Sequence, residues 1–148
     1  LHNRQQEGMR LQEDLLSKVD DMSHLVDELE IQSPLILEEY KKRLHSKIDD
    51  LMEDHTILDS RIAAEITIYA DKVCIDEEMV RLKSHVAEAR TSLMTRENIG
   101  RKMDFLAQEM NREANTILSK STDVKIADLG IELKTLIEKI REQIQNLE

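Results

Sequence analysis

The stretch of sequence that decides the fold is LQEDLLSKVDDMSHLVDEL, residues 11–29. Its apolar residues recur in steps of three and four, and charged or polar residues occupy most other positions. This period is that of an amphipathic α-helix with one apolar face. The face consists of Leu11, Leu15, Val19, Met22, Val26 and Leu29. We expect a helix from about residue 3 to residue 31 that packs through this face.

The composition of the whole chain agrees with this local pattern. The 148 residues include one Pro and three Gly, and 2% are aromatic, whereas 35% are charged. Strands favour aromatic and β-branched residues in alternation, so this composition disfavours a sheet-rich fold. We therefore expect an all-α fold, an elongated bundle of about six helices.

Ser33-Pro34 predicts the start of a second helix. Ser is a good N-cap, and Pro is tolerated at the first helical position because its missing N–H has no helical partner there. The apolar stripe that follows is Leu37, Tyr40, Leu44, Ile48 and Leu51. Two long helices joined by a short turn predict an acidic N-terminal αα-hairpin arm over residues 1–58. Residues 59–148 would then form the helical core.

Four further helices are expected within residues 59–148. Asp59, Asp76 and Asn98 are placed to cap three of them. Ile75 and Val80 have the spacing of a hydrophobic staple. The expected ranges are 60–72, 76–95, 99–120 and 123–147.

Cysteine content and apolar runs exclude some classes of protein. Cys74 is the only cysteine, which excludes an internal disulfide and a cysteine metal cluster. No apolar run approaches the roughly 18 residues of a membrane span, and no signal peptide is visible. The chain begins at Leu1 without a Met, so we expect a fragment of a longer protein.

The net charge of −10 is unevenly distributed. Residues 1–60 contain 7 Lys and Arg against 15 Asp and Glu, whereas residues 100–121 contain 4 against 3. A whole-chain surface for nucleic acid is therefore absent, but a local one stays open. Phe105 is the only aromatic residue near the net-positive window. We expect any nucleic acid to be held by phosphates, metal and shape rather than by base stacking.

The helix expected over residues 99–120 begins with two cations. Arg101 and Lys102 oppose the helix dipole, which favours anions in the first turn. An anion bound to the free N–H groups would explain them, and Gly100 would let a phosphate approach the backbone closely. Alternatively, the two cations pair with Glu97 or with an acidic face of another helix.

Carboxylates and a histidine offer a second kind of chemistry. Glu109 and Glu113 lie four residues apart on one helix face and could share a divalent cation, or Arg112 could simply neutralise them. On the helix over residues 76–95, His85 shares a face with the residues one and two turns before it, Arg81 and Glu78. Glu78 and His85 could complete a metal site, or His85 could transfer protons near neutral pH. The alternative is that His85 is merely packed or solvated.

Several of these stretches resemble the YicC-like proteins. The similarity is strongest from Ile99-Gly100-Arg101-Lys102 to Asn115-Thr116 and continues through Ser119-Lys120-Ser121. It extends to residues 76–85, to Ser33-Pro34 and to residues 138–148, so it covers essentially the whole chain.

The resemblance implies an activity and partners that the residues alone do not show. Members of the family are bacterial, cytosolic and longer than this chain, with a strand-rich N-terminal half that is absent here. The family is implicated in endoribonuclease activity that depends on Mn²⁺ or Mg²⁺. Its members are thought to form ring-like hexamers that enclose RNA. The resemblance therefore implies RNA and further copies of the chain as partners, rather than DNA or a membrane.

These observations lead to one hypothesis with one alternative. We hypothesise a metal-dependent endoribonuclease that clamps and cleaves structured RNA. The expected catalytic residues are Glu109, Glu113 and His85, and the expected metal ligands are Glu109, Glu113 and Glu78. The expected contacts to RNA phosphates are Gly100, Arg101, Lys102, Arg112, Asn115 and Lys120. The alternative is a non-catalytic helical adaptor in RNA turnover, in which Glu109, Arg112 and Glu113 form ion pairs between subunits.

Overall fold

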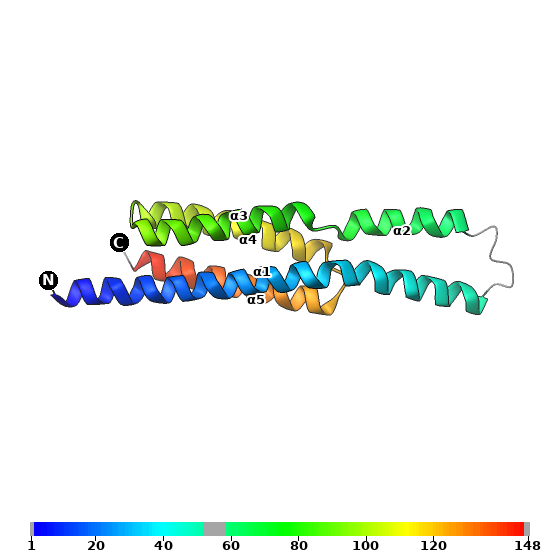
Figure 1. Ribbon diagram of the computed structural model, residues 1–148, viewed down its shortest axis with the longest axis horizontal. Coiled ribbons are helices and arrows are strands. Elements are labelled where there is room, and N and C mark those ends of the chain that lie inside the picture. Colours follow the sequence, from blue (N-terminus) through cyan, green and yellow to red (C-terminus); the bar gives the residue numbers. More distant parts are fainter. Residues whose placement is uncertain (1, 52–58, 147–148) are drawn as a thin grey trace.

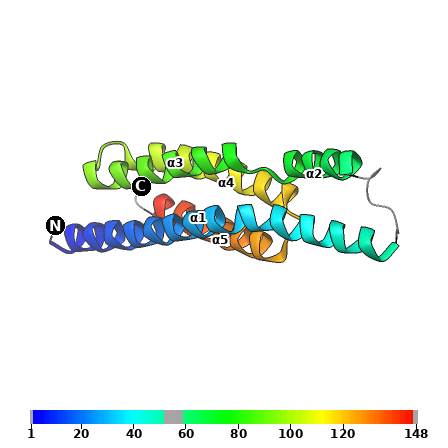
Figure 2. The ribbon, with the colours of Figure 1, turned by 45° about the vertical axis from the view of Figure 1, so that its right-hand side comes forward.

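The helices of the described chain run along one long axis (Figures 1 and 2). The computed structural model describes residues 2–51 and 59–146, with side chains from residue 5. The helices are α1 His2–Leu51, α2 Asp59–Val73, α3 Asp76–Thr95, α4 Ile99–Lys120 and α5 Val124–Gln145. These residues contain no strand. The expected all-α class is therefore confirmed.

Four of the helices surround one hydrophobic core. α4 packs against α3 and α5, and α1 also packs against α3 and α5. Five of the six residues of the apolar face expected over residues 11–29 are buried in this core, and Leu11 is partly buried. Described residues from both expected parts, the arm and the core, thus contribute to one hydrophobic core. The fully buried apolar residues of α3, α4 and α5 include Leu82, Leu93, Met103, Met110, Ile117, Leu133, Ile137 and Ile140.

The expected helix boundary at Ser33-Pro34 is wrong. α1 continues through Pro34 and has no break between His2 and Leu51. The physical reason is the core, because every seventh residue is buried on both sides of Pro34: Leu15, Met22, Leu29 and Ile36. One uninterrupted helix keeps all four on the same face. In the described residues a single helix therefore replaces the two that were expected.

The hairpin is made by different segments than expected. Beyond Ile36, α1 leaves the core and runs beside α2, and we call residues 37–51 of α1 together with α2 the extension (Figure 1). The rings of Tyr40 and Tyr69 stack there with centroids 3.7 Å apart. The hydroxyl of Tyr69 also lies 2.6 Å from Oγ1 of Thr122, between α4 and α5. The end of the expected arm, residues 52–58, lies outside the described residues.

The helix ends agree with the expectations in position but only partly in chemistry. α4 has the expected bounds, yet Asn98 sits at its N-cap in the left-handed region, with φ of 49°, and its side chain makes no cap hydrogen bond. Asp76 is the first residue of α3 rather than its cap. Val80 is 69% exposed, so the staple with buried Ile75 does not form. Asp123 caps α5 by accepting a hydrogen bond from the backbone N–H of Ile126.

Candidate functional site

The candidate site lies where α3 and α4 pack against each other. A short connection that contains Arg96 and Asn98, both in the left-handed region, turns the chain from one helix into the next. Two polar contacts cross the interface: His85 faces Glu113, and Glu78 faces Lys120. Because the partners are seven residues apart in both helices, the contacts lie about two turns apart. We call this line of contacts the polar seam.

His85 and Glu113 form an isolated pair in the middle of the polar seam. Nδ1 of His85 lies 2.7 Å from Oε1 of Glu113, and the two side chains are 17% and 2% exposed. Both atoms are buried, and neither makes a hydrogen bond of good geometry with another described residue. A bare nitrogen lone pair facing a carboxylate oxygen would be repulsive, so Nδ1 must carry a proton. With a proton on Nδ1, Nε2 is the ring nitrogen left with a lone pair.

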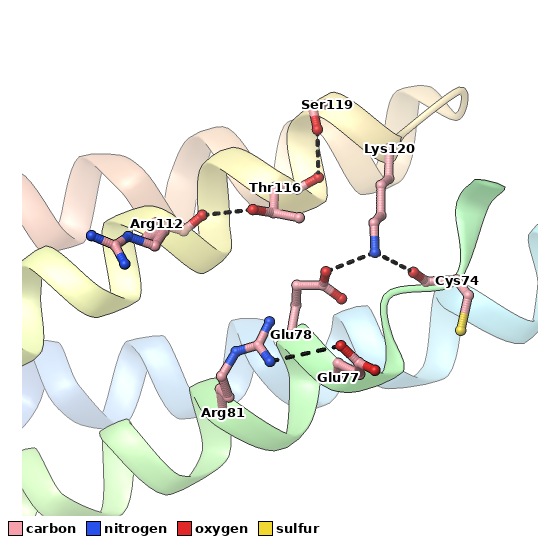
Figure 3. Close-up of polar contacts among 8 residues, drawn as sticks. All are labelled: Cys74, Glu77, Glu78, Arg81, Arg112, Thr116, Ser119 and Lys120. Atoms are coloured by element: carbon pink, nitrogen blue, oxygen red, sulfur yellow. Dashed lines mark hydrogen bonds and ion pairs between the residues drawn. The ribbon is translucent and has the colours of Figure 1, made fainter. Parts of the chain in front are cut away.

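Glu78 and Lys120 form the second contact of the polar seam. Figure 3 shows Lys120 reaching from the end of α4 to Glu78 and to the backbone of Cys74. Its Nζ donates to Oε1 of Glu78 at 2.7 Å and to the Cys74 carbonyl at 3.0 Å. Oε2 of Glu78 is buried without a hydrogen-bond partner among the described residues.

The environment of Glu78 keeps its carboxylate charged. Burial by itself raises the pKa of this group. The hydrogen bond from Lys120, a backbone hydrogen bond and the charges of Lys120 and Arg81 outweigh burial, so the pKa of Glu78 lies below its ordinary value of 4.5. The ammonium of Lys120 is therefore already matched by a buried anion, which disfavours it as a phosphate contact.

The outer face of α4 carries the other expected phosphate contacts. The side chains of Arg101, Lys102, Arg112 and Asn115 are exposed, and Gly100 is half-buried. Within the described part of the chain, Arg101 and Lys102 form no ion pair, so the alternative pairing with Glu97 is not found. Two unpaired cations in the first turn of a helix remain suited to an anion.

A groove between α3 and α4 combines Lys102 with residues for which the sequence predicts no role. It has a volume of about 490 Å³, and Lys102 lies in its wall. Phe105 also lines it and is 59% exposed. The other lining residues are Ser84, Ala87, Glu88, Thr91, Ser92 and Leu106. A signal for Phe105 was present in the sequence, because it lies off the apolar stripe of α4.

The expected metal ligands do not assemble into one site. Each carboxylate faces a different side chain: Glu78 meets Lys120, Glu113 meets His85, and Glu109 lies 4.0 Å from Arg112. Across residues 5–51 and 59–146, no three His, Cys, Asp or Glu side chains are grouped so that they could hold a metal ion. A ligand set of Glu78, Glu109 and Glu113 therefore does not fit this geometry.

None of the helices in the described residues combines the length and apolarity needed to cross a membrane.

Comparison with known proteins agrees with the resemblance in the sequence. The family model "Endoribonuclease YicC-like, C-terminal" matches residues 29–148. The probable endoribonuclease YicC of Clostridioides difficile (strain 630) is 47% identical over 146 residues, which is 98% of this chain and 50% of that protein. The probable endoribonuclease YicC of Haemophilus influenzae (strain ATCC 51907 / DSM 11121 / KW20 / Rd) is 38% identical over 146 residues, with the same coverage of 98% and 50%.

The match covers a different share of this chain than of its relatives. The chain spans about half the length of the curated relatives it matches, although the relatives cover nearly all of the chain. The matched region includes α3 and α4 and therefore the whole polar seam. The chain belongs to the family of YicC-like endoribonucleases and carries its C-terminal domain.

Proposed function

We propose that this chain is the half of an endoribonuclease that binds RNA phosphates and transfers a proton during cleavage. The observation that carries the proposal is the isolated pair of His85 and Glu113, 2.7 Å apart. Glu113 of this pair belongs to α4, the same helix whose outer face carries the exposed cations. The names of the relatives favour RNA as the substrate.

In this proposal His85 is the proton-transfer group. The carboxylate of Glu113, 2.7 Å from Nδ1, favours the tautomer with its proton on Nδ1 and orients the ring. Nε2 can then accept a proton from the hydroxyl that attacks the phosphodiester, either a water or a ribose 2′-hydroxyl. Glu113 touches the ring rather than the RNA, so it is a positioning residue.

The cations of α4 would hold the substrate in this proposal. Arg101 and Lys102 can bind one phosphate together with the free N–H groups at the start of α4. Arg112 is 79% exposed, so its guanidinium can reach a second phosphate while it remains near Glu109. Positive charge near the reacting phosphoryl group also stabilises the negative charge that develops during cleavage.

Metal dependence stays a prediction that the described residues do not support directly. Because Glu78, Glu109 and Glu113 face different partners, no step above passes through a metal ion. A cleavage assay with Mn²⁺ and with a chelator tests this point. The assay should compare this chain with a version that also carries the other half found in the relatives.

The proton-transfer role predicts the effect of three substitutions. His85→Gln should lower the rate constant of cleavage by about 10²- to 10⁴-fold, because it removes the proton acceptor. Glu113→Gln should lower the same rate constant with little change in KM, because an amide can leave the ring in the wrong tautomer. His24→Gln is the matched control, since His24 is an exposed histidine of α1. The measurement is cleavage of a labelled structured RNA across a range of pH.

Each result of this assay has a clear meaning. Unchanged cleavage by His85→Gln in a folded protein would remove His85 from the mechanism. Equal losses in His85→Gln and His24→Gln would point to a general loss of structure. Product ends would separate the two attacking groups, because attack by the ribose hydroxyl leaves a cyclic phosphate and attack by water does not.

A further inference from the structure

A second groove lies away from the polar seam, where the extension meets the core. Its walls come from the last turns of α1, from α2, and from the connection between α4 and α5. Its volume is about 530 Å³. We call it the extension groove, and its lining residues are Tyr40, Arg43, Leu44, Ser46, Lys47, Tyr69 and Thr122.

The extension groove is positively charged within an acidic part of the chain. Residues 40–48 contain four Lys and Arg and no Asp or Glu, although residues 1–60 as a whole are strongly acidic. Arg43 and Lys47 are four residues apart, so they share one face of α1. Both are exposed, and neither forms an ion pair with any residue that the structure describes. Lys41, by contrast, lies 3.5 Å from Glu38.

The walls of the extension groove add aromatic rings and hydroxyl groups to these charges. The stacked rings of Tyr40 and Tyr69 form one wall, and the contact between Tyr69 and Thr122 holds the α4–α5 connection against the extension. Grooves that bind single-stranded nucleic acid combine positive charge along the backbone with aromatic side chains. The extension groove has both features.

The extension groove also lies close to the helix that carries the proposed RNA contacts. Thr122 follows the end of α4 by two residues. An RNA strand that runs along α4 and past Lys120 would therefore reach this groove next. Arg43 and Lys47, which form no ion pair with a described residue, would then supply positive charge within an N-terminal segment whose net negative charge repels RNA.

We propose that the extension groove is a second RNA site, in which Arg43 and Lys47 bind phosphates of a single-stranded segment. This inference rests on the proposed function, because it names a further contact to the same class of substrate. It differs from that function in its residues, since none of the groove residues belongs to α3 or α4. The two sets can therefore be tested separately.

The test measures how the affinity for RNA depends on salt. The probe is a fluorescein-labelled, single-stranded RNA of 20 uridines, titrated with this chain at several NaCl concentrations. Loss of two phosphate contacts should reduce the slope of log K against log salt by about 1.4, since a single strand contributes about 0.7 per contact. For Arg43→Gln/Lys47→Gln, the affinity lost between 50 and 200 mM salt should thus be about 7-fold smaller than for the unsubstituted chain.

Three further variants make the result decisive. Lys134→Gln/Lys139→Gln removes the same charge from α5 and should leave the slope almost unchanged. Arg43→Lys/Lys47→Arg keeps the charge and should restore the slope, which separates phosphate binding from damage to the helix. Arg101→Gln/Arg112→Gln tests the contacts on α4 in the same assay.

The pattern of slopes distinguishes the two proposals. If only Arg101→Gln/Arg112→Gln makes the slope of log K against log salt less steep, the extension groove is not an RNA site and the proposed function stands. If only Arg43→Gln/Lys47→Gln lowers it, the groove is confirmed and the α4 contacts are wrong. If neither lowers it, both proposals are overturned. Equal lowering by Arg43→Gln/Lys47→Gln and by the α5 control would also overturn the groove, because net charge alone would explain it.

Discussion

Lys120 shows how one side chain can determine the charge of a buried neighbour. Its hydrogen bond is the largest of the effects that lower the pKa of Glu78, and burial opposes it. A carboxyl group whose pKa is lowered by folding stabilises the protein above its unfolded pKa. That contribution is fully present above pH 4.5 and is lost as the pH falls below 4.5.

Lys120→Met should therefore destabilise the protein in a pH-dependent way. The substitution leaves a buried carboxylate without its main donor, so we expect a loss of about 1–3 kcal/mol at pH 7. The pKa of Glu78 rises in the variant, and protonation then relieves the penalty as the pH falls. The difference from the unsubstituted protein should shrink toward pH 4, as measured by urea unfolding. Lys125→Met, at an exposed lysine, is the control; a difference that stays constant with pH would contradict this account.

At the residue scale, the sequence patterns indicated which residues lie at the candidate site, but not which of them contact one another. The spacing correctly placed His85 and Glu78 on one face of α3, and it placed Glu113 on α4. It could not show that Glu113 faces His85, since that depends on how two helices align. A pattern along one helix carries no information about how two helices align. The sequence therefore suggests a shared cation for Glu109 and Glu113, which are neighbours on one helix, rather than a contact between Glu113 and His85.

At the scale of elements, α1 shows how a core overrides a local signal. Ser33-Pro34 favours a helix start when only neighbouring residues are considered. Leu29 and Ile36 lie seven residues apart and are both buried in the same core. A comparison of the apolar positions on the two sides of Pro34 would have revealed the continuous helix. The ends of α3, α4 and α5 were predicted well because no competing signal lies inside them.

The two interpretations of Pro34 predict opposite effects of substitution. In a continuous helix Pro34 lacks the N–H that would bond to Glu30, so Pro34→Ala should raise the free energy of unfolding by about 1–3 kcal/mol. Ser33→Ala should have little effect there. If residue 33 were an N-cap, Ser33→Ala would instead cost about 1 kcal/mol and Pro34→Ala would bring no gain. Urea unfolding of the two variants distinguishes these cases.

At the scale of the whole molecule, Arg112 separates the nuclease from the adaptor interpretation. Its ion-pair partner in the described residues is Glu109 of the same helix. We therefore expect Arg112→Glu to weaken RNA binding and cleavage while the molecular mass in solution stays unchanged. Light scattering coupled to size exclusion measures that mass, and Arg112→Lys is the control. Dissociation of an oligomer by Arg112→Glu would favour the adaptor, and the oligomeric state itself remains a prediction.

The place of Pro34 in the molecule has a mechanical consequence. α2 and α3 follow one another along a line beside α1 (Figures 1 and 2), and the helical hydrogen bonding between them is interrupted at Cys74 and Ile75. Pro34 and Cys74 line the same groove. Helical hydrogen bonds are therefore missing at the same level of the long axis in α1 and between α2 and α3. We expect bending between the core and the extension to be easiest at this level, because helical hydrogen bonds are missing on both sides of the molecule there. An RNA bound at both proposed sites would cross this level, so such bending would change the distance between the two sites.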